Sequence, residues 1–149
     1  MKNKNKDFVY KLVAHSYKNG SGYIVVRIKD DQRLSHWTLP IEDGLESIPV
    51  SGESHHIKEL QHKHFAFGSE VLLIPEPDNP YSKNAIGVLD KKQKYKVGYI
   101  PKEEEKRILK RISEDWLKKA IVMWEIREGR QRVSIRLLLI GQNASLYIP

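Results

Sequence analysis

The chain has 149 residues, no cysteine and a formal net charge of +7 at pH 7. This composition excludes disulfides, thiol nucleophiles and zinc sites built on sulfur, and the length suits one domain with an elaboration. The positive charge favours an anionic partner, and no apolar run approaches the roughly 20 residues that span a bilayer, so we expect a soluble, cytoplasmic protein without membrane contact.

The first predicted element is a β-hairpin. Residues 1–6 are polar and carry three lysines, so we expect a disordered start. Strand-like runs follow over 8–14 and 23–29, separated by a cluster of turn-forming residues at 17–22. The second run alternates in side-chain direction, as a strand requires.

A connection without clear periodicity spans residues 30–47. We expect four apolar residues to attach it to the core, namely Trp37, Leu39, Pro40 and Ile41. The segment 48–57 that follows is predicted to be a strand, with Gly52 marking a bulge or a close approach of the backbone.

Four histidines within ten residues raise the question of a metal site: His55, His56, His62 and His64. A zinc site needs three or four converging ligands, and neither cysteine nor a His-Glu-x-x-His spacing is present. We therefore expect no metal here. Residues 58–63 are predicted to form a helical turn that brings Phe65 and Phe67 to the core.

Three apolar runs, at 71–74, 85–89 and 95–100, predict strands that hold a proline-rich loop at 75–84. Its three prolines lack the N–H that a ladder needs, and its Asp, Asn and Ser residues favour turns. Two interpretations of Tyr81 at the loop tip stay open. The ring either folds back as a lid over the barrel mouth, or stands in solvent as a stacking platform.

A helix is predicted over residues 102–119, because apolar residues recur there at spacings of three and four, at Ile108, Leu109, Ile112, Trp116 and Leu117. The glutamates at 103–105 suit the positive N-terminal end of a helix, which we prefer to a metal or acid/base cluster.

A strand pair is predicted next, over 120–126 and 132–140, with a half-buried alternation in the second strand. The tail 143–149 is expected to add a short edge strand. Strands, one helix and further strands predict a mainly β fold, a small partly open OB-like barrel with one main helix and an added N-terminal hairpin.

Three motifs stand in a fixed order along the chain: Glu76-Pro77-Asp78-Asn79-Pro80-Tyr81, Asn84-Ala85-Ile86 and Val97-Gly98-Tyr99-Ile100-Pro101. In this order and spacing the chain resembles the HIRAN domains, which occur at the front of helicase-like DNA-repair ATPases and in bacteria. Upstream, Val50-Ser51-Gly52 followed by His55-His56 is similar to the first strand of that family. The resemblance covers roughly residues 48–140, leaving an N-terminal extension at 1–47 and a tail at 141–149.

The resemblance implies binding of the 3′ end of single-stranded DNA. Transferred to this chain, Tyr81 and His55 sandwich the terminal base, with His56 completing the aromatic pair of the first strand. The same transfer assigns phosphate contacts to Tyr99 and Lys102, loop ordering or end contact to Asn79, and loop capping to Asn84.

One position departs from the family pattern, since Ser82 stands where the family has Asp. A neutral acceptor is weaker than a charged one, so we expect a reduced preference for a 3′ hydroxyl and less repulsion of a 3′ phosphate.

Basic residues surround these positions: Lys83, Lys94, Lys96, Lys102, Lys106 and Arg107. Aromatic faces beside a basic track are what single-strand binding requires, with stacking worth about 1 to 3 kcal/mol per base. An ordinary solvated surface is the alternative for each lysine taken singly.

No nucleophile with a base, no paired carboxylates with a pocket and no Gly-x-x-x-x-Gly-Lys phosphate loop is apparent in the sequence. We therefore expect a monomeric, non-enzymatic binding module without catalytic residues or cofactors, whose helicase or nuclease partner lies in another chain. A protein-interaction module, an RNA-binding module and a nuclease or metal-dependent hydrolase subunit remain as alternatives.

Overall fold

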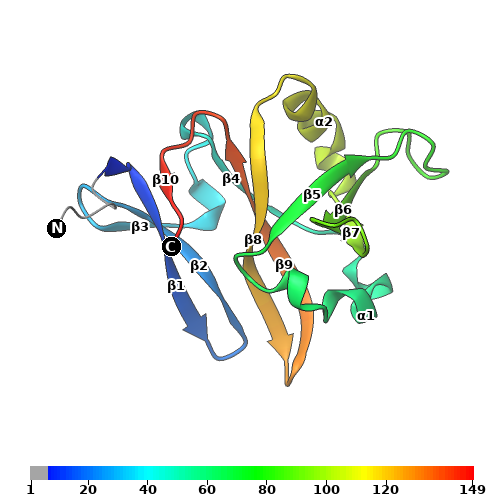
Figure 1. The fold of residues 1–149 in the computed structure, drawn as a ribbon, viewed down its shortest axis with the longest axis horizontal. Helices are drawn as coiled ribbons and strands as arrows, with labels where there is room; N and C mark the ends of the chain where they lie inside the picture. Colours follow the sequence, from blue (N-terminus) through cyan, green and yellow to red (C-terminus); the bar gives the residue numbers. More distant parts are fainter. Residues whose placement is uncertain (1–6) are drawn as a thin grey trace.

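The computed structural model describes residues 7–149, so the expected disorder of residues 1–6 lies outside the described part of the chain. The fold is mainly β with one main helix, as predicted, and ten strands belong to one continuous sheet (Figure 1). The strands are β1 (Tyr10–Tyr17), β2 (Gly20–Arg27), β3 (Gln32–Leu34), β4 (Leu45–Pro49), β5 (Glu70–Pro75), β6 (Ile86–Asp90), β7 (Lys96–Tyr99), β8 (Leu117–Glu128), β9 (Gln131–Gly141) and β10 (Leu146–Tyr147). The α-helices are α1 (Ile57–Leu60) and α2 (Glu105–Ser113).

Six strands curl into an OB-like barrel. Antiparallel pairing runs from β7 through β6, β5, β8 and β9 to β4. The seam between β4 and β7 is joined by a bridge between Ser51 and Tyr99, whose backbone N–H groups donate to each other's carbonyl oxygens at 2.8 Å. This bridge follows directly on the end of β4 and fixes the chain around residue 51 against β7.

A close backbone approach at the seam accounts for Gly98. A Cβ on Gly98 would lie 2.4 Å from the carbonyl oxygen of Ser51 and 2.8 Å from Cγ1 of Val50. Any larger residue would therefore push β7 away from the chain that follows β4.

The larger hydrophobic core fills the barrel. Its fully buried side chains include Phe65, Leu60, Ile86, Val88, Val97, Ile100, Ile108, Ile135, Leu137 and Leu139. Ile108 comes from α2, so the apolar stripe of this helix packs on the barrel as its spacing predicted.

A second core lies between the N-terminal hairpin and the outer face of β8 and β9. It contains Tyr10, Leu12, Val25, Leu39, Leu45, Ile121, Met123, Leu138 and Ile140. Alternate residues of β8 and β9 thus enter the two cores, and these strands are buried on both faces where the hairpin covers them.

The hairpin has a shorter turn than predicted, because β1 ends at Tyr17 and β2 begins at Gly20. Gly20 and Gly22 lie inside β2, where they pair with Ile126 and Trp124 of β8. A Cβ on Gly22 would meet the carbonyl oxygen of Met123 at 2.2 Å. These glycines serve a close strand contact and not a loop.

Of the connection 30–47, Leu39 is buried as expected, but the prediction that Trp37 and Ile41 attach to the core is wrong, since both are exposed. The connection also contains the short strand β3, which pairs with β2.

The strand predicted over 48–57 was misplaced as well. β4 ends at Pro49, and Gly52, with φ of 78°, begins the 3-10 helix Glu53–His55.

The main helix is shorter than its predicted range of 102–119. A 3-10 turn at Lys102–Glu104 leads into α2, which ends at Ser113. Asp115 adopts φ of 55° and redirects the chain, so Trp116 and Leu117 are not helical. Trp116 instead packs against Arg111, whose guanidinium lies 4.1 Å from the ring centroid.

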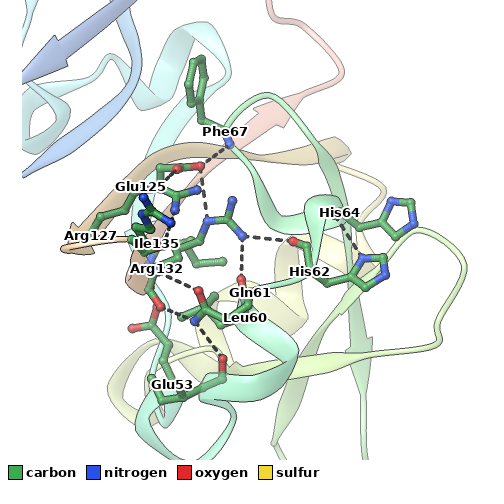
Figure 2. A network of polar contacts seen from close by, with 12 residues as sticks. Glu53, Leu60, Gln61, His62, His64, Phe67, Glu125, Arg127, Arg132 and Ile135 are labelled. Carbon is green, nitrogen blue, oxygen red and sulfur yellow. Dashed lines mark hydrogen bonds and ion pairs between the residues drawn. The ribbon is translucent and has the colours of Figure 1, made fainter.

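A buried polar network ties the segment that follows His55 to β8 and β9 (Figure 2). Arg132 donates to the carbonyl oxygens of Leu60 at 2.6 Å and His62 at 3.0 Å, and its guanidinium lies 3.3 Å from Glu125. The other Glu125 contacts come from the backbone N–H of Phe67 at 2.9 Å and from Arg127 at 2.7 Å. Both charges of the pair are buried, so removal of either side chain would leave an uncompensated charge between this segment and the barrel.

None of the helices in residues 7–149 has the length and apolarity that a bilayer crossing requires.

Candidate nucleic-acid interface

A hollow of about 850 Å³ opens at the barrel rim, which we call the rim hollow. It lies between the proline-rich loop, the Ser51–Tyr99 seam and the beginning of α2. Its lining comprises Ser51, Pro75, Glu76, Pro77, Asp78, Asn79, Pro80, Tyr81, Ser82, Ala85, Tyr99, Ile100, Lys102 and Glu105. The loop projects from the end of β5 and returns to β6 beside α2 (Figure 1).

Internal hydrogen bonds fix the proline-rich loop. The side-chain oxygen of Asn79 accepts from the backbone N–H groups of Tyr81 at 2.8 Å and Ser82 at 3.2 Å, and its amide donates to Glu76 at 3.2 Å. The Tyr81 side chain is 91 % exposed. The ring is therefore no lid folded over the barrel, but stands in solvent on an ordered loop.

An ion pair underlies the loop. Lys96 Nζ lies 2.6 Å from Glu76 Oε2 and 3.0 Å from the hydroxyl oxygen of Tyr99, which donates to Glu76 Oε1 at 3.2 Å. Burial acts to raise the pKa of Glu76, but the bonds from Lys96, Asn79 and Tyr99 outweigh it, and the pKa is lowered. Glu76 is therefore the anionic anchor of the loop.

Two of the basic residues singled out in the sequence have acidic partners. Lys96 pairs with Glu76, and Arg107 pairs with Glu46 and Glu104. Four others are exposed and form no ion pair within residues 7–149, namely Lys83, Lys94, Lys102 and Lys106. Of these, Lys102 lines the hollow.

Ser82 joins the loop to α2. Its hydroxyl donates to Glu105 Oε1 at 2.9 Å and accepts from the backbone N–H of Asn84 at 3.2 Å. Glu105 is buried and is the first residue of α2. A carboxylate thus lines the hollow beside Ser82, although it comes from a different element.

The structure brings Asn79, Tyr81, Ser82, Tyr99 and Lys102 together around the rim hollow. His55, His56, Lys83 and Asn84 are not among its lining residues. His55 is exposed in the 3-10 helix Glu53–His55, four positions beyond Ser51. Its role as the second ring stays a prediction.

Sequence reasoning missed Ser51, Glu76 and Glu105 as lining residues. The sequence held one usable signal for Glu105, namely the position of the predicted helix. The motif Val97-Gly98-Tyr99-Ile100-Pro101 ends β7, and a helix that follows this strand begins close to the residues at its end. Nothing in the spacing indicated that Glu76 would pair with Lys96.

Within residues 7–149 no group of three or more His, Cys, Asp or Glu side chains is arranged to hold a metal ion. His62 instead stacks against His64 and Tyr95, with ring centroids 4.5 Å and 4.4 Å apart.

A family model described as "HIRAN domain" matches residues 48–140, which is more than half of the chain. The chain belongs to the HIRAN domain family. HIRAN domains are DNA-binding modules rather than catalytic ones. The matched HIRAN residues include the whole lining of the rim hollow.

One solved HIRAN structure supports the fold, and a second similar structure is also found. The crystal structure of the HIRAN domain of human HLTF is similar with a TM-score of 0.51 and 20 % identity, covering 66 % of this chain and 74 % of that chain. A protein from Lactobacillus plantarum gives a TM-score of 0.46 and 20 % identity, covering 64 % of this chain and 92 % of that chain. No curated protein matches the chain. At 20 % identity the human structure supports the fold alone.

Proposed function

We propose that this HIRAN domain binds the 3′ end of single-stranded DNA in the rim hollow, with the terminal base stacked on Tyr81. The observation that carries the proposal is a 91 % exposed aromatic ring on a loop fixed by its own hydrogen bonds. A ring that is already held in place loses little freedom when a base stacks on it. Stacking on an aromatic side chain contributes about 1 to 3 kcal/mol per base.

His55 is the proposed second ring of the sandwich. Gly52 turns the chain immediately after Ser51, and Glu53 holds the short helix to β9 by accepting from the backbone N–H of Ile135 at 2.6 Å. His55 therefore belongs to an anchored segment that begins two residues after Ser51, and Ser51 lines the hollow. An imidazole ring can stack on a base, and its protonated form also attracts phosphate.

Exposed cations supply the proposed backbone contacts. Lys102 lies in the lining beside Tyr99, and Lys83 follows Tyr81 on the loop. We leave Lys96 and Arg107 out of the phosphate contacts, because their charges are already paired with carboxylates. Neutralisation of phosphates by the remaining lysines releases counterions, so binding weakens as salt concentration rises.

The first test measures fluorescence anisotropy with labelled oligonucleotides that end in a 3′ hydroxyl, in a 3′ phosphate or in a closed hairpin. Tyr81→Ala is expected to weaken binding of the free ends by about 1 to 3 kcal/mol, because the stacking surface is lost. Tyr81→Phe keeps the ring and is the matched control, with binding close to that of the wild type.

Equal and negligible binding of all three oligonucleotides would rule the proposal out. An affinity that does not change with salt concentration would point to a peptide-binding groove. Equal affinity for an RNA of the same sequence would show that the site does not prefer DNA.

We assign to Glu105 the preference for a strand that ends in a 3′ hydroxyl over one that ends in a 3′ phosphate. Ser82 by itself offers a neutral acceptor, but the Glu105 carboxylate beside it can accept a bond from a 3′ hydroxyl and repels a 3′ phosphate. Glu105→Gln is expected to reduce the ratio of hydroxyl-end to phosphate-end affinity by roughly tenfold, since bonds to charged groups contribute about 1.5 to 3 kcal/mol.

Glu103→Gln provides the control for the Glu105 experiment, because Glu103 is exposed and does not line the hollow. Both variants remove one negative charge close to the start of α2. An unchanged end preference in Glu105→Gln, or an equal change in both variants, would show that Glu105 does not read the end.

A further inference from the structure

A second hollow, of about 620 Å³, lies between the N-terminal extension and the outer face of β8 and β9, and we call it the extension groove. It is lined by Tyr17, Tyr23, Ile24, Arg33, Leu34, Ser35, His36, Trp37, Pro49, Met123, Trp124, Ile126, Ser134, Ile135 and Arg136. Three of the large exposed apolar side chains of the described chain gather here although they come from distant segments, namely Tyr17, Trp37 and Ile126. An exposed cluster of this kind marks a contact surface.

Trp37 presents a flat surface in the extension groove. The guanidinium of Arg136 lies 4.6 Å from the centroid of its ring, and Arg136 Nε donates to Ser47 Oγ at 2.6 Å. The indole is nevertheless 75 % exposed. A fixed cation thus lies over the indole. The His36 ring also lies 4.5 Å from it at an interplanar angle of 45°, and the exposed remainder of the ring is available to a flat ligand.

The charge of the extension groove is positive. Arg33 and Arg136 belong to the lining, which contains no Asp or Glu. Glu53 touches the edge, accepting from the Ser134 hydroxyl at 3.2 Å, and burial raises its pKa to about 7, which reduces its charge near neutral pH. Exposed rings beside unopposed arginines suit a ligand that is both flat and anionic, which describes a nucleotide.

The extension groove and the rim hollow both border residues 49–55, which we call the ridge. Pro49 lines the groove and Ser51 lines the rim hollow, two residues apart on an extended segment that rises about 3.3 Å per residue. Ser134 of the groove also bonds Glu53, which is in the same short helix as His55. A strand leaving the rim hollow past His55 therefore reaches the groove within a few nucleotides.

We propose that the extension groove is a second binding site for the same single strand, where a base a few nucleotides from the terminus stacks on Trp37. The inference rests on the proposed function of the rim hollow, and it assigns a nucleic-acid contact to residues outside the matched HIRAN region. Single-strand sites on OB folds cover about 4 to 16 nucleotides, which leaves room for a contact beyond the terminal base.

A length series tests this proposal with the full chain. Oligothymidines of about three and about ten nucleotides are titrated against wild type, Trp37→Ala and Tyr81→Ala, because only the longer strand can occupy both sites. Trp37→Ala is expected to weaken binding of the longer strand by roughly 5- to 100-fold and to leave the shorter one unchanged. Tyr81→Ala is expected to weaken both. Trp37→Phe keeps an aromatic face and should restore most of the affinity for the longer strand.

Because Trp37 is exposed, its replacement leaves both cores intact, and an unchanged unfolding midpoint checks this. If Trp37→Ala binds both lengths like the wild type while Tyr81→Ala is impaired, the second site is refuted and an acidic peptide becomes the better occupant of the groove. If the wild type binds neither strand, the proposed function of the rim hollow fails, and this proposal with it.

Discussion

The rim hollow and the extension groove both present an exposed aromatic ring beside cations, but they are built differently. Most of the rim hollow comes from one continuous segment, 75–82, whose polar side chains bond one another. The extension groove joins residues of β1, β2, β3, β4, β8 and β9 with the short helix His36–Thr38. The shape of the first therefore depends on local hydrogen bonds, and the shape of the second on how the hairpin packs against the barrel.

One glycine at each site allows two backbones to approach closely. Gly98 brings β7 against Ser51 at the rim hollow, and Gly22 brings β2 against Met123 and Trp124 beside the extension groove. In each case the atoms that a Cβ would meet belong partly to the opposing backbone. The two glycines therefore offer a way to disturb one hollow at a time.

The largest effects are expected for Gly22→Ala and Gly98→Ala. Each should lower the free energy of unfolding by about 1 to 3 kcal/mol or more, because a rigid neighbour has to move, and urea denaturation measures the loss. Gly22→Ala carries the shorter contact, 2.2 Å against 2.4 Å, whereas Gly98 also has φ of 155°, a conformation that strains an L side chain. In the binding assay Gly22→Ala should impair only the longer oligonucleotide, whereas Gly98→Ala should impair both.

Gly129→Asn is a control for the glycine variants. Gly129 has φ of 61°, and a Cβ there meets no atom within 4 Å. Asn tolerates this conformation better than other residues, so stability and binding should change little. If Gly22→Ala kept full affinity for the longer strand, the groove would not depend on hairpin packing.

A smaller, pH-dependent effect is expected from Glu53 on the ridge between the hollows. Burial raises its pKa from 4.5 to about 7, so the folded protein holds this proton more tightly than the unfolded chain. The resulting stabilisation is fully present below about pH 4.5 and is lost as the pH rises through about 7. Urea midpoints of wild type and Glu53→Gln should therefore diverge across this window, with the wild type showing the steeper decline toward alkaline pH.

The comparison of the two proteins cancels the titration of the histidines, which both contain. Equal pH profiles for wild type and Glu53→Gln would contradict the raised pKa of the Glu53 carboxyl group.

Much of the rim could be predicted from the sequence because its signals are local. The apolar runs of β5, β6 and β7 flank three prolines, and the ring of Tyr81 is at the tip of the loop between β5 and β6. The partners of that loop were not visible, since Glu76 reaches Lys96 and Ser82 reaches Glu105 across more than 19 positions of chain. Spacing alone carries no information on such pairings.

The errors in the fold have a similar origin. Trp116 continues the helical spacing, but the positive φ of Asp115 redirects the chain before it. Trp37 is apolar and was assigned to the core, although it lies on the rim of a groove that exists only when residues 10–27 cover the barrel. The double burial of β9 was missed for the same reason, because its second partner comes from the distant hairpin.

The wall formed by β8 and β9 belongs to both cores, and this has a consequence for handling the protein. A fragment cut to residues 48–140 would leave Ile121, Met123, Leu138 and Ile140 facing water along adjacent strands. Such a bare apolar face promotes self-association. Because the two cores share this wall, they should unfold as one cooperative unit. The bounds of the family match, 48–140, are therefore a poor choice for expression.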